Sequence, residues 1–159
     1  MKTDASRQQL ERAARLGHEA RAEGGDHAAL KLWLRLLATS TQVEDEIRRR
    51  LRARFGISLP RFDYLAQLYR VPDGLKMKDL SRQLMVTGGN VTGLTDELER
   101  EGLVERVGSP TDRRSWIVRL TATGRSGFQA MAAEHEGWVL ELFGGLDAKA
   151  VQQLHAHLG

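Results

Sequence analysis

The chain has 159 residues, a formal net charge of +3 and no cysteine. This length can bury one hydrophobic core and leave a second packing surface for another subunit, and the lack of cysteine excludes disulfides, thiolate nucleophiles and cysteine-ligated zinc. No apolar run approaches the length of a membrane span and the mixed Arg/Glu N-terminus is unlike a targeting peptide, so we expect a cytoplasmic protein without membrane contact.

The first 57 residues are predicted to be mostly helical. Residues 1–25 form an expected helical arm, because positions 4–23 are rich in Ala, Arg and Glu and a Gly-Gly pair follows them. From Asp26, an expected N-cap, a long helix should run to Phe55 along one apolar face. Five arginines between positions 48 and 54 could bind phosphate, but the acidic residues at 44–46 favour a solvated face of balanced charge.

The next segment is predicted to be a helix followed by a helix-turn-helix. Ser58 and Pro60 should open the single helix, and a Pro-Asp-Gly turn should end it. Residues 77–85 and 88–101 then form two amphipathic helices separated by a polar turn. The earlier of the two supports the later one, which is the expected recognition helix.

The recognition helix should turn Val91, Leu94 and Leu98 inward and present its opposite face to a DNA groove. Because four acidic residues lie in its second half, we expect it to enter the groove by its N-terminal end, where the helix dipole favours phosphate. The residues expected at the DNA are Thr87 as N-cap, Gly88 and Gly89 at the phosphates, Asn90 at adenine and Thr92 at thymine.

Residues 103–107 and 116–120 are predicted to form the two strands of a wing. Four arginines and one acidic residue lie in the span that begins at position 106 and ends at position 119, a local net charge of +3. Arg114 is expected to enter a minor groove beside Arg113, with Asp112 orienting its guanidinium. The expected phosphate contacts of the helix-turn-helix are Lys76, Lys78 and Arg82.

Residues 121–159 are predicted to form two more helices, capped by Thr121 and Asp147 and separated by a Gly-Gly pair. The first carries an apolar stripe typical of a dimer interface: Phe128, Met131, His135, Trp138 and Leu142. The fold class is therefore mainly α with a small antiparallel β wing. Residues 58–120 form the expected winged helix-turn-helix lobe, and 26–57 with 121–159 form the expected helical dimerisation lobe.

Four motifs stand out between Leu59 and Gly124: Asn90-Val91-Thr92, Leu98-Glu99-Arg100-Glu101-Gly102-Leu103-Val104, Asp112-Arg113-Arg114 and Leu120-Thr121-Ala122-Thr123-Gly124. With these motifs the stretch resembles the MarR family of bacterial transcription regulators. The resemblance implies a homodimeric repressor that binds double-stranded DNA at a palindromic operator, without a cofactor. It also implies release by a small ligand, commonly an aromatic carboxylic acid or its coenzyme A thioester. It adds Gly93 to the recognition residues, at a position where many relatives carry a polar side chain, so we expect fewer contacts with base edges here.

Other functions have weaker support in the sequence. Trp33, His135 and Trp138 are candidates for a ligand pocket, although core or dimer packing is the preferred interpretation. His155 and His157 are two residues apart on a helix and have no cysteine to complement them, so we expect no metal site. No phosphate-binding loop, carboxylate pair or activated nucleophile indicates an enzyme. The alternative function is a winged-helix protein-interaction module without specific DNA binding.

Overall fold

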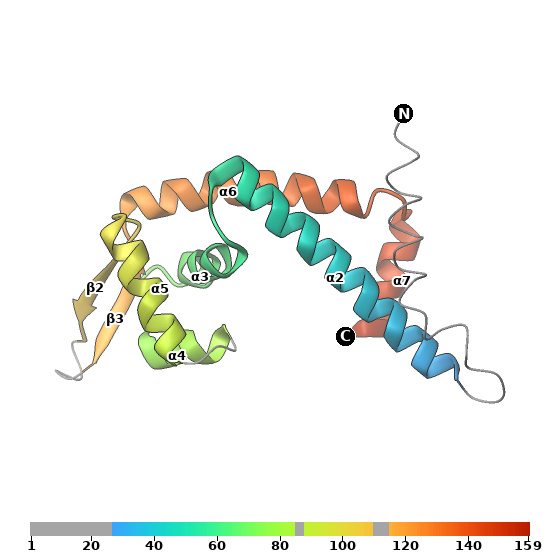
Figure 1. Cartoon of the computed structure of the whole chain (residues 1–159), viewed down its shortest axis with the longest axis horizontal. Coiled ribbons are helices and arrows are strands. Elements are labelled where there is room, and N and C mark those ends of the chain that lie inside the picture. Colours follow the sequence, from blue (N-terminus) through green and yellow to red (C-terminus); the bar gives the residue numbers. More distant parts are fainter. Residues whose placement is uncertain (1–26, 85–87, 110–114) are drawn as a thin grey trace. The chain divides into compact units, whose positions relative to one another are not determined.

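The computed structural model describes residues 27–84, 88–109 and 115–159, which form six helices and three strands (Figure 1). The chain divides into two compact units, Met1–Glu46 and Ile47–Gly159. Helix α2, Ala28–Phe55, begins in the first unit and ends in the second. The N-terminal arm and the expected cap Asp26 lie outside the described residues.

The second unit contains a winged helix-turn-helix, which confirms the predicted fold class. Its helices are α3 (Leu59–Arg70), α4 (Met77–Gln83) and α5 (Gly88–Arg100). Strands β2 (Val104–Gly108) and β3 (Trp116–Leu120) pair antiparallel, as expected for the wing. The two-residue strand β1 (Leu75–Lys76) was not predicted; it pairs with β3, so that the sheet order is β1-β3-β2.

The core of this unit lies between one face of the sheet and the helices α3, α4 and α5, and the end of α2 and the start of α6 also contribute buried residues. Burying large aliphatic side chains contributes about 1.5–3 kcal/mol each, and most of the predicted inward positions are used in this way. Among the described residues, the fully buried aliphatic side chains include Leu51, Leu65, Leu68, Leu80, Val91, Leu98, Val104 and Val118.

The end of α5 and the start of the next long helix meet at one tight junction. Gly102 adopts a left-handed conformation, with φ of 71°, and its N–H donates to the carbonyl of Glu99, which ends α5. The Thr121 hydroxyl donates to the Gly102 carbonyl at 2.6 Å and accepts from the Gly124 N–H at 3.0 Å. A Cβ at Gly124 would lie 1.8 Å from the Leu103 carbonyl oxygen, so only glycine fits there.

Two helices complete the chain, α6 (Ala122–Leu142) and α7 (Ala148–Leu158). The predicted caps are confirmed, because the Thr121 and Asp147 side chains accept N–H bonds from the first turns of α6 and α7. Gly144 and Gly145 lie between the two helices, as expected.

Much of the apolar stripe of α6 packs within the chain: Phe128 and Met131 belong to the core, and a dimer interface on the half-buried remainder stays a prediction. The Phe128 ring lies 5.3 Å from that of Phe62, the His135 ring lies 4.9 Å from Phe62, and Trp138 lies 6.2 Å from Phe55. Amphipathic spacing identifies a buried face but cannot say whether the covering surface belongs to the same chain. Helices α2 and α3 cover it here.

Two of the arginines near the end of α2 also contact α6. Arg50 donates to Glu141 at 2.7 Å, and Arg54 donates to Glu134 at 3.0 Å. These contacts support the interpretation of a charge-balanced face, although the balancing carboxylates of this pair of arginines come from α6.

Candidate nucleic-acid interface

The N-terminal half of α5 presents the side chains expected at DNA. Asn90, Thr92 and Gly93 are exposed, whereas Val91 is fully buried. A Cβ at Gly93 would meet no atom within 4 Å, so this position is open. Gly88 and Gly89 form the start of the helix. Thr87 lies outside the described residues, and contact between DNA and any of these residues remains a prediction.

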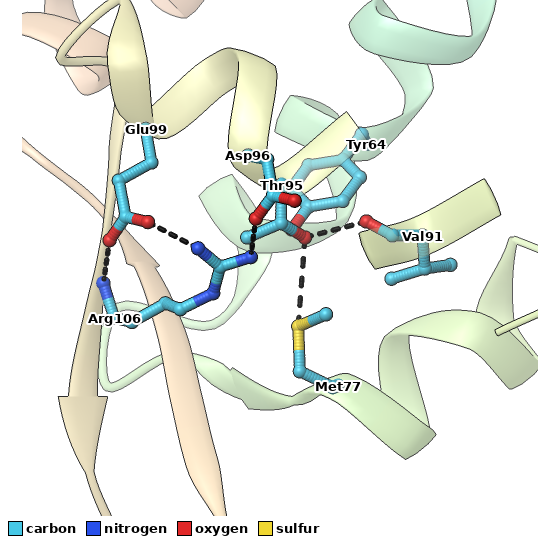
Figure 2. A network of polar contacts seen from close by, with 7 residues as sticks. All are labelled: Tyr64, Met77, Val91, Thr95, Asp96, Glu99 and Arg106. Carbon is cyan, nitrogen blue, oxygen red and sulfur yellow. Dashed lines mark hydrogen bonds and ion pairs between the residues drawn. The ribbon is translucent and has the colours of Figure 1, made fainter. Parts of the chain in front are cut away.

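A buried polar network fixes α5 against the helices behind it (Figure 2). Thr95 is fully buried, and its hydroxyl bonds the Val91 carbonyl at 2.7 Å. It also bonds the hydroxyl of Tyr64 on α3 and approaches the sulfur of Met77 on α4 at 3.6 Å. Burial raises the pKa of Tyr64 to about 12, although the bond to Thr95 acts in the opposite direction. Sequence reasoning missed this network.

Arg106 on β2 attaches the other side of α5 to the wing sheet (Figure 2). Its guanidinium forms ion pairs with Asp96 and Glu99, and its backbone N–H donates to Glu99 at 3.1 Å. Partial burial lowers the pKa of Arg106, but hydrogen bonds and attraction from both carboxylates outweigh it, so the net shift is upward. The guanidinium therefore holds the recognition helix to the sheet.

These ion pairs correct the expected basic cluster of the wing. Arg106 is committed to α5, and Arg119 donates to Glu105 at 2.7 Å. The sequence count of charges overlooked these carboxylates, because they come from outside the hairpin loop or from the facing strand. All three predicted wing contacts, Asp112, Arg113 and Arg114, lie outside the described residues.

Most of the acidic residues in α5 and directly after its end are paired with arginines of the protein. Besides the two carboxylates bound by Arg106, Glu101 pairs with Arg61 of α3. Three of the four acidic side chains that would repel phosphate are thus held by arginines of the same unit. This arrangement supports an approach to DNA through the N-terminal half of α5.

The three expected phosphate contacts lie at or beside α4. Lys76 and Lys78 are exposed, and Arg82 is exposed with Asp79 at 3.4 Å. A surface pair at this distance is weak and can exchange for a phosphate contact. All three cations are at the surface of the helix-turn-helix, and their contact with phosphate stays a prediction.

The candidate pocket residues have different surroundings. His135 and Trp138 are half-buried packing residues of the second unit, in contact with Phe62 and Phe55. Trp33 belongs to the first unit, where its side chain is 58% exposed. Among the described residues, no group of three potential metal ligands comes together, and no helix combines the length and apolar character of a membrane span.

Comparison with known proteins gives consistent results. Residues 55–115 match the sequence model of the MarR family. The chain is 32% identical over 120 residues to the transcriptional activatory protein BadR of Rhodopseudomonas palustris, covering 74% of this chain and 68% of BadR.

Two solved structures show the same fold. One is Sco3205, a MarR family transcriptional regulator from Streptomyces coelicolor in complex with DNA, with 23% identity, TM-score 0.74 and coverage of 87% of this chain and 89% of that one. The other is CouR from Rhodococcus jostii RHA1 bound to p-coumaroyl-CoA, with 23% identity, TM-score 0.69 and coverage of 80% and 88%.

Proposed function

The chain belongs to the MarR family of DNA-binding transcription regulators, and we propose that it is a homodimeric repressor of a palindromic operator, released by a small aromatic acid or its coenzyme A thioester. Its fold and relatives are those of regulators and not of enzymes. The proposal places Thr87, Gly88, Gly89, Asn90, Thr92 and Gly93 in one groove and Asp112, Arg113 and Arg114 in the next. Lys76, Lys78 and Arg82 bind phosphates.

The observation that carries this proposal is the asymmetry of α5. Asn90, Thr92 and Gly93 in its first half are exposed, and this half has no acidic side chain. Arginines hold most of the carboxylates in and just after its second half. A helix of this kind can insert its N-terminus into the major groove, where backbone N–H groups and short polar side chains meet phosphates and base edges.

The first experiment is a salt series with the protein's own upstream intergenic DNA and unrelated DNA of equal length. Specific binding that weakens steeply with salt supports the proposal. Replacing Arg114 with alanine should weaken operator binding without unfolding the protein; undiminished affinity would remove the wing from the mechanism. Equally weak binding to both DNAs would instead favour the protein-interaction function.

Exposed apolar residues support the homodimer. Five large hydrophobic side chains are exposed between positions 30 and 37 of α2, and six more are exposed between positions 140 and 158. Surfaces of this kind in a monomer mark an interaction site. We expect two-fold symmetry to place the recognition helices about 34 Å apart, one DNA turn. Sedimentation analysis should find a dimer at micromolar concentration, and a monomer would refute this part of the proposal.

The effector proposal draws on CouR, whose solved structure contains an aromatic acyl-coenzyme A. In this chain His135 and Trp138 are half-buried on α6, which continues from the end of the wing. A ligand beside α6 would alter the separation or freedom of the two recognition helices. Titrating the operator complex with p-coumaric acid and with p-coumaroyl-CoA tests both chemical classes, and a reporter assay separates repression from activation.

A further inference from the structure

One exposed aromatic residue is not explained by the core or by the proposed dimer surfaces. Among the described residues, twelve large hydrophobic side chains are exposed, and eleven of them lie at positions 30–37 or 140–158. The twelfth is Trp116, which is 55% exposed at the start of β3 in the winged helix. Tryptophan at such a surface is typical of a binding interface.

The strand register places Trp116 on the face of the sheet that carries α5. Trp116 pairs with Gly108, and Arg106 pairs with Val118, so that all four lie on one face because alternate residues share a side. Val118 is buried, and Arg106 binds Asp96 and Glu99 of α5. Trp116 therefore lies two residues along the strand from Val118, in the next cross-strand pair on the face where Arg106 attaches α5 to the sheet.

The distance from Val118 to Trp116 along β3 leads toward the N-terminal half of α5. Two strand residues span about 7 Å, a little more than one helical turn of about 5.4 Å. Figure 1 shows that β3 begins on the side of the unit where α5 also begins. Counting one turn back from Asp96 reaches Thr92 and Gly93, which are exposed. Trp116 is thus a wing residue on the side of the sheet that faces the recognition helix.

The indole has room for a partner in this place. Its cross-strand neighbour is a glycine, and a Cβ built there would meet nothing within 4 Å. Trp116 takes part in none of the ring contacts found among the described residues, in contrast to Trp138.

We propose that Trp116 binds the DNA backbone between the major groove entered by α5 and the minor groove entered by the wing. The ring packs on a deoxyribose, and its Nε1–H donates to a phosphate oxygen, since an indole offers an apolar face and one donor. This inference rests on the DNA-binding geometry proposed above. Because a backbone contact carries no sequence information, Trp116 strengthens binding to operator and to unrelated DNA alike.

The test compares Trp116→Ala and Trp116→Phe with the wild-type dimer by fluorescence anisotropy. The alanine variant should bind both DNAs about tenfold more weakly, and the phenylalanine variant should recover part of the loss. The dependence on salt should not change, because no charge is removed. The matched control is Arg119→Gln, an exposed position on the other face of the same strand, which should change affinity by less than about threefold.

A second readout reports the contact directly. In a Trp33→Phe/Trp138→Phe background that binds like wild type, Trp116 is the only tryptophan, because the chain has three. Its emission should change on adding DNA, with the midpoint seen by anisotropy. Unchanged emission together with wild-type affinity in Trp116→Ala would overturn this inference while leaving the proposed function intact. A wild-type protein that fails to bind any DNA would overturn both.

Discussion

The buried hydroxyl pair of Tyr64 and Thr95 should be strongly coupled in a double-mutant cycle. Thr95→Val keeps the shape but leaves the Tyr64 hydroxyl buried without this partner, which should cost about 2 kcal/mol of unfolding free energy. Tyr64→Phe should cost about 1 kcal/mol, because the Thr95 hydroxyl keeps its bond to the Val91 carbonyl. The double variant should be more stable, by about 1 kcal/mol, than the sum of the two single losses of unfolding free energy predicts.

Guanidinium unfolding followed by circular dichroism measures these values, at one fixed protein concentration because a dimer is expected. Thr41→Val is the control: this hydroxyl makes the same kind of bond to the carbonyl four residues earlier, at 2.9 Å, but on an exposed surface. Its cost should stay within about 0.5 kcal/mol. Additive effects in the cycle, or an equal loss in the control, would refute the reasoning.

The same tyrosine should make stability depend on alkaline pH. Burial raises its pKa to about 12 in the folded protein, whereas an unfolded tyrosine titrates near about 10. Above the unfolded value the unfolded chain loses a proton that the folded chain retains, so stability falls as pH rises toward the folded value. The wild-type protein should lose more stability than Tyr64→Phe over this window, and parallel curves would contradict the assigned burial.

Three further substitutions follow from the packing and charge of the second unit. Gly124→Ala should destabilise by more than about 3 kcal/mol in denaturant unfolding, because its Cβ would lie 1.8 Å from a backbone carbonyl oxygen, whereas the control Gly127→Ala, with open space around it, should be neutral or stabilising. Arg106→Ala should lower the free energy of unfolding by about 1–3 kcal/mol and weaken operator binding, because it releases two carboxylates of α5. The control Arg119→Ala breaks an exposed ion pair and should lower the free energy of unfolding by at most about 1 kcal/mol. Equal losses of stability in the two variants would show that the contact with α5 has no special role. Lys78→Ala should lower the slope of log affinity against log salt by about 1, and an unchanged slope would remove this residue from the phosphate contacts.

Local signals in the sequence were sufficient for the helices and for the wing strands. The hydroxyl of Thr121 and the carboxylate of Asp147 cap the helices that they were expected to cap. The recognition helix begins at the predicted residue and ends one residue early. These features depend on residues close together in the chain, which is why periodicity and capping chemistry reveal them.

Features that depend on distant partners were missed. Strand β1 has two residues, too few to show any alternation, and it exists because β3 offers an edge. Thr95 lies four residues after Val91 on the inward face of the helix, but a polar residue is not expected to be buried. It is buried because its hydroxyl bonds that of Tyr64, which is 31 residues away in the sequence. Arg106 was included in the net positive charge of the wing, because its carboxylate partners belong to another element, α5.

The junction between α5 and α6 limits how a signal can reach the DNA. Thr121 bonds the carbonyls of both Gly102 and Leu103, and Gly124 leaves no space between helix and loop. Bending at this point would break several short contacts at once, so we expect the end of α5 and the start of α6 to move together. If an effector acts beside α6 as proposed, substitutions that loosen this junction should weaken its effect on DNA binding.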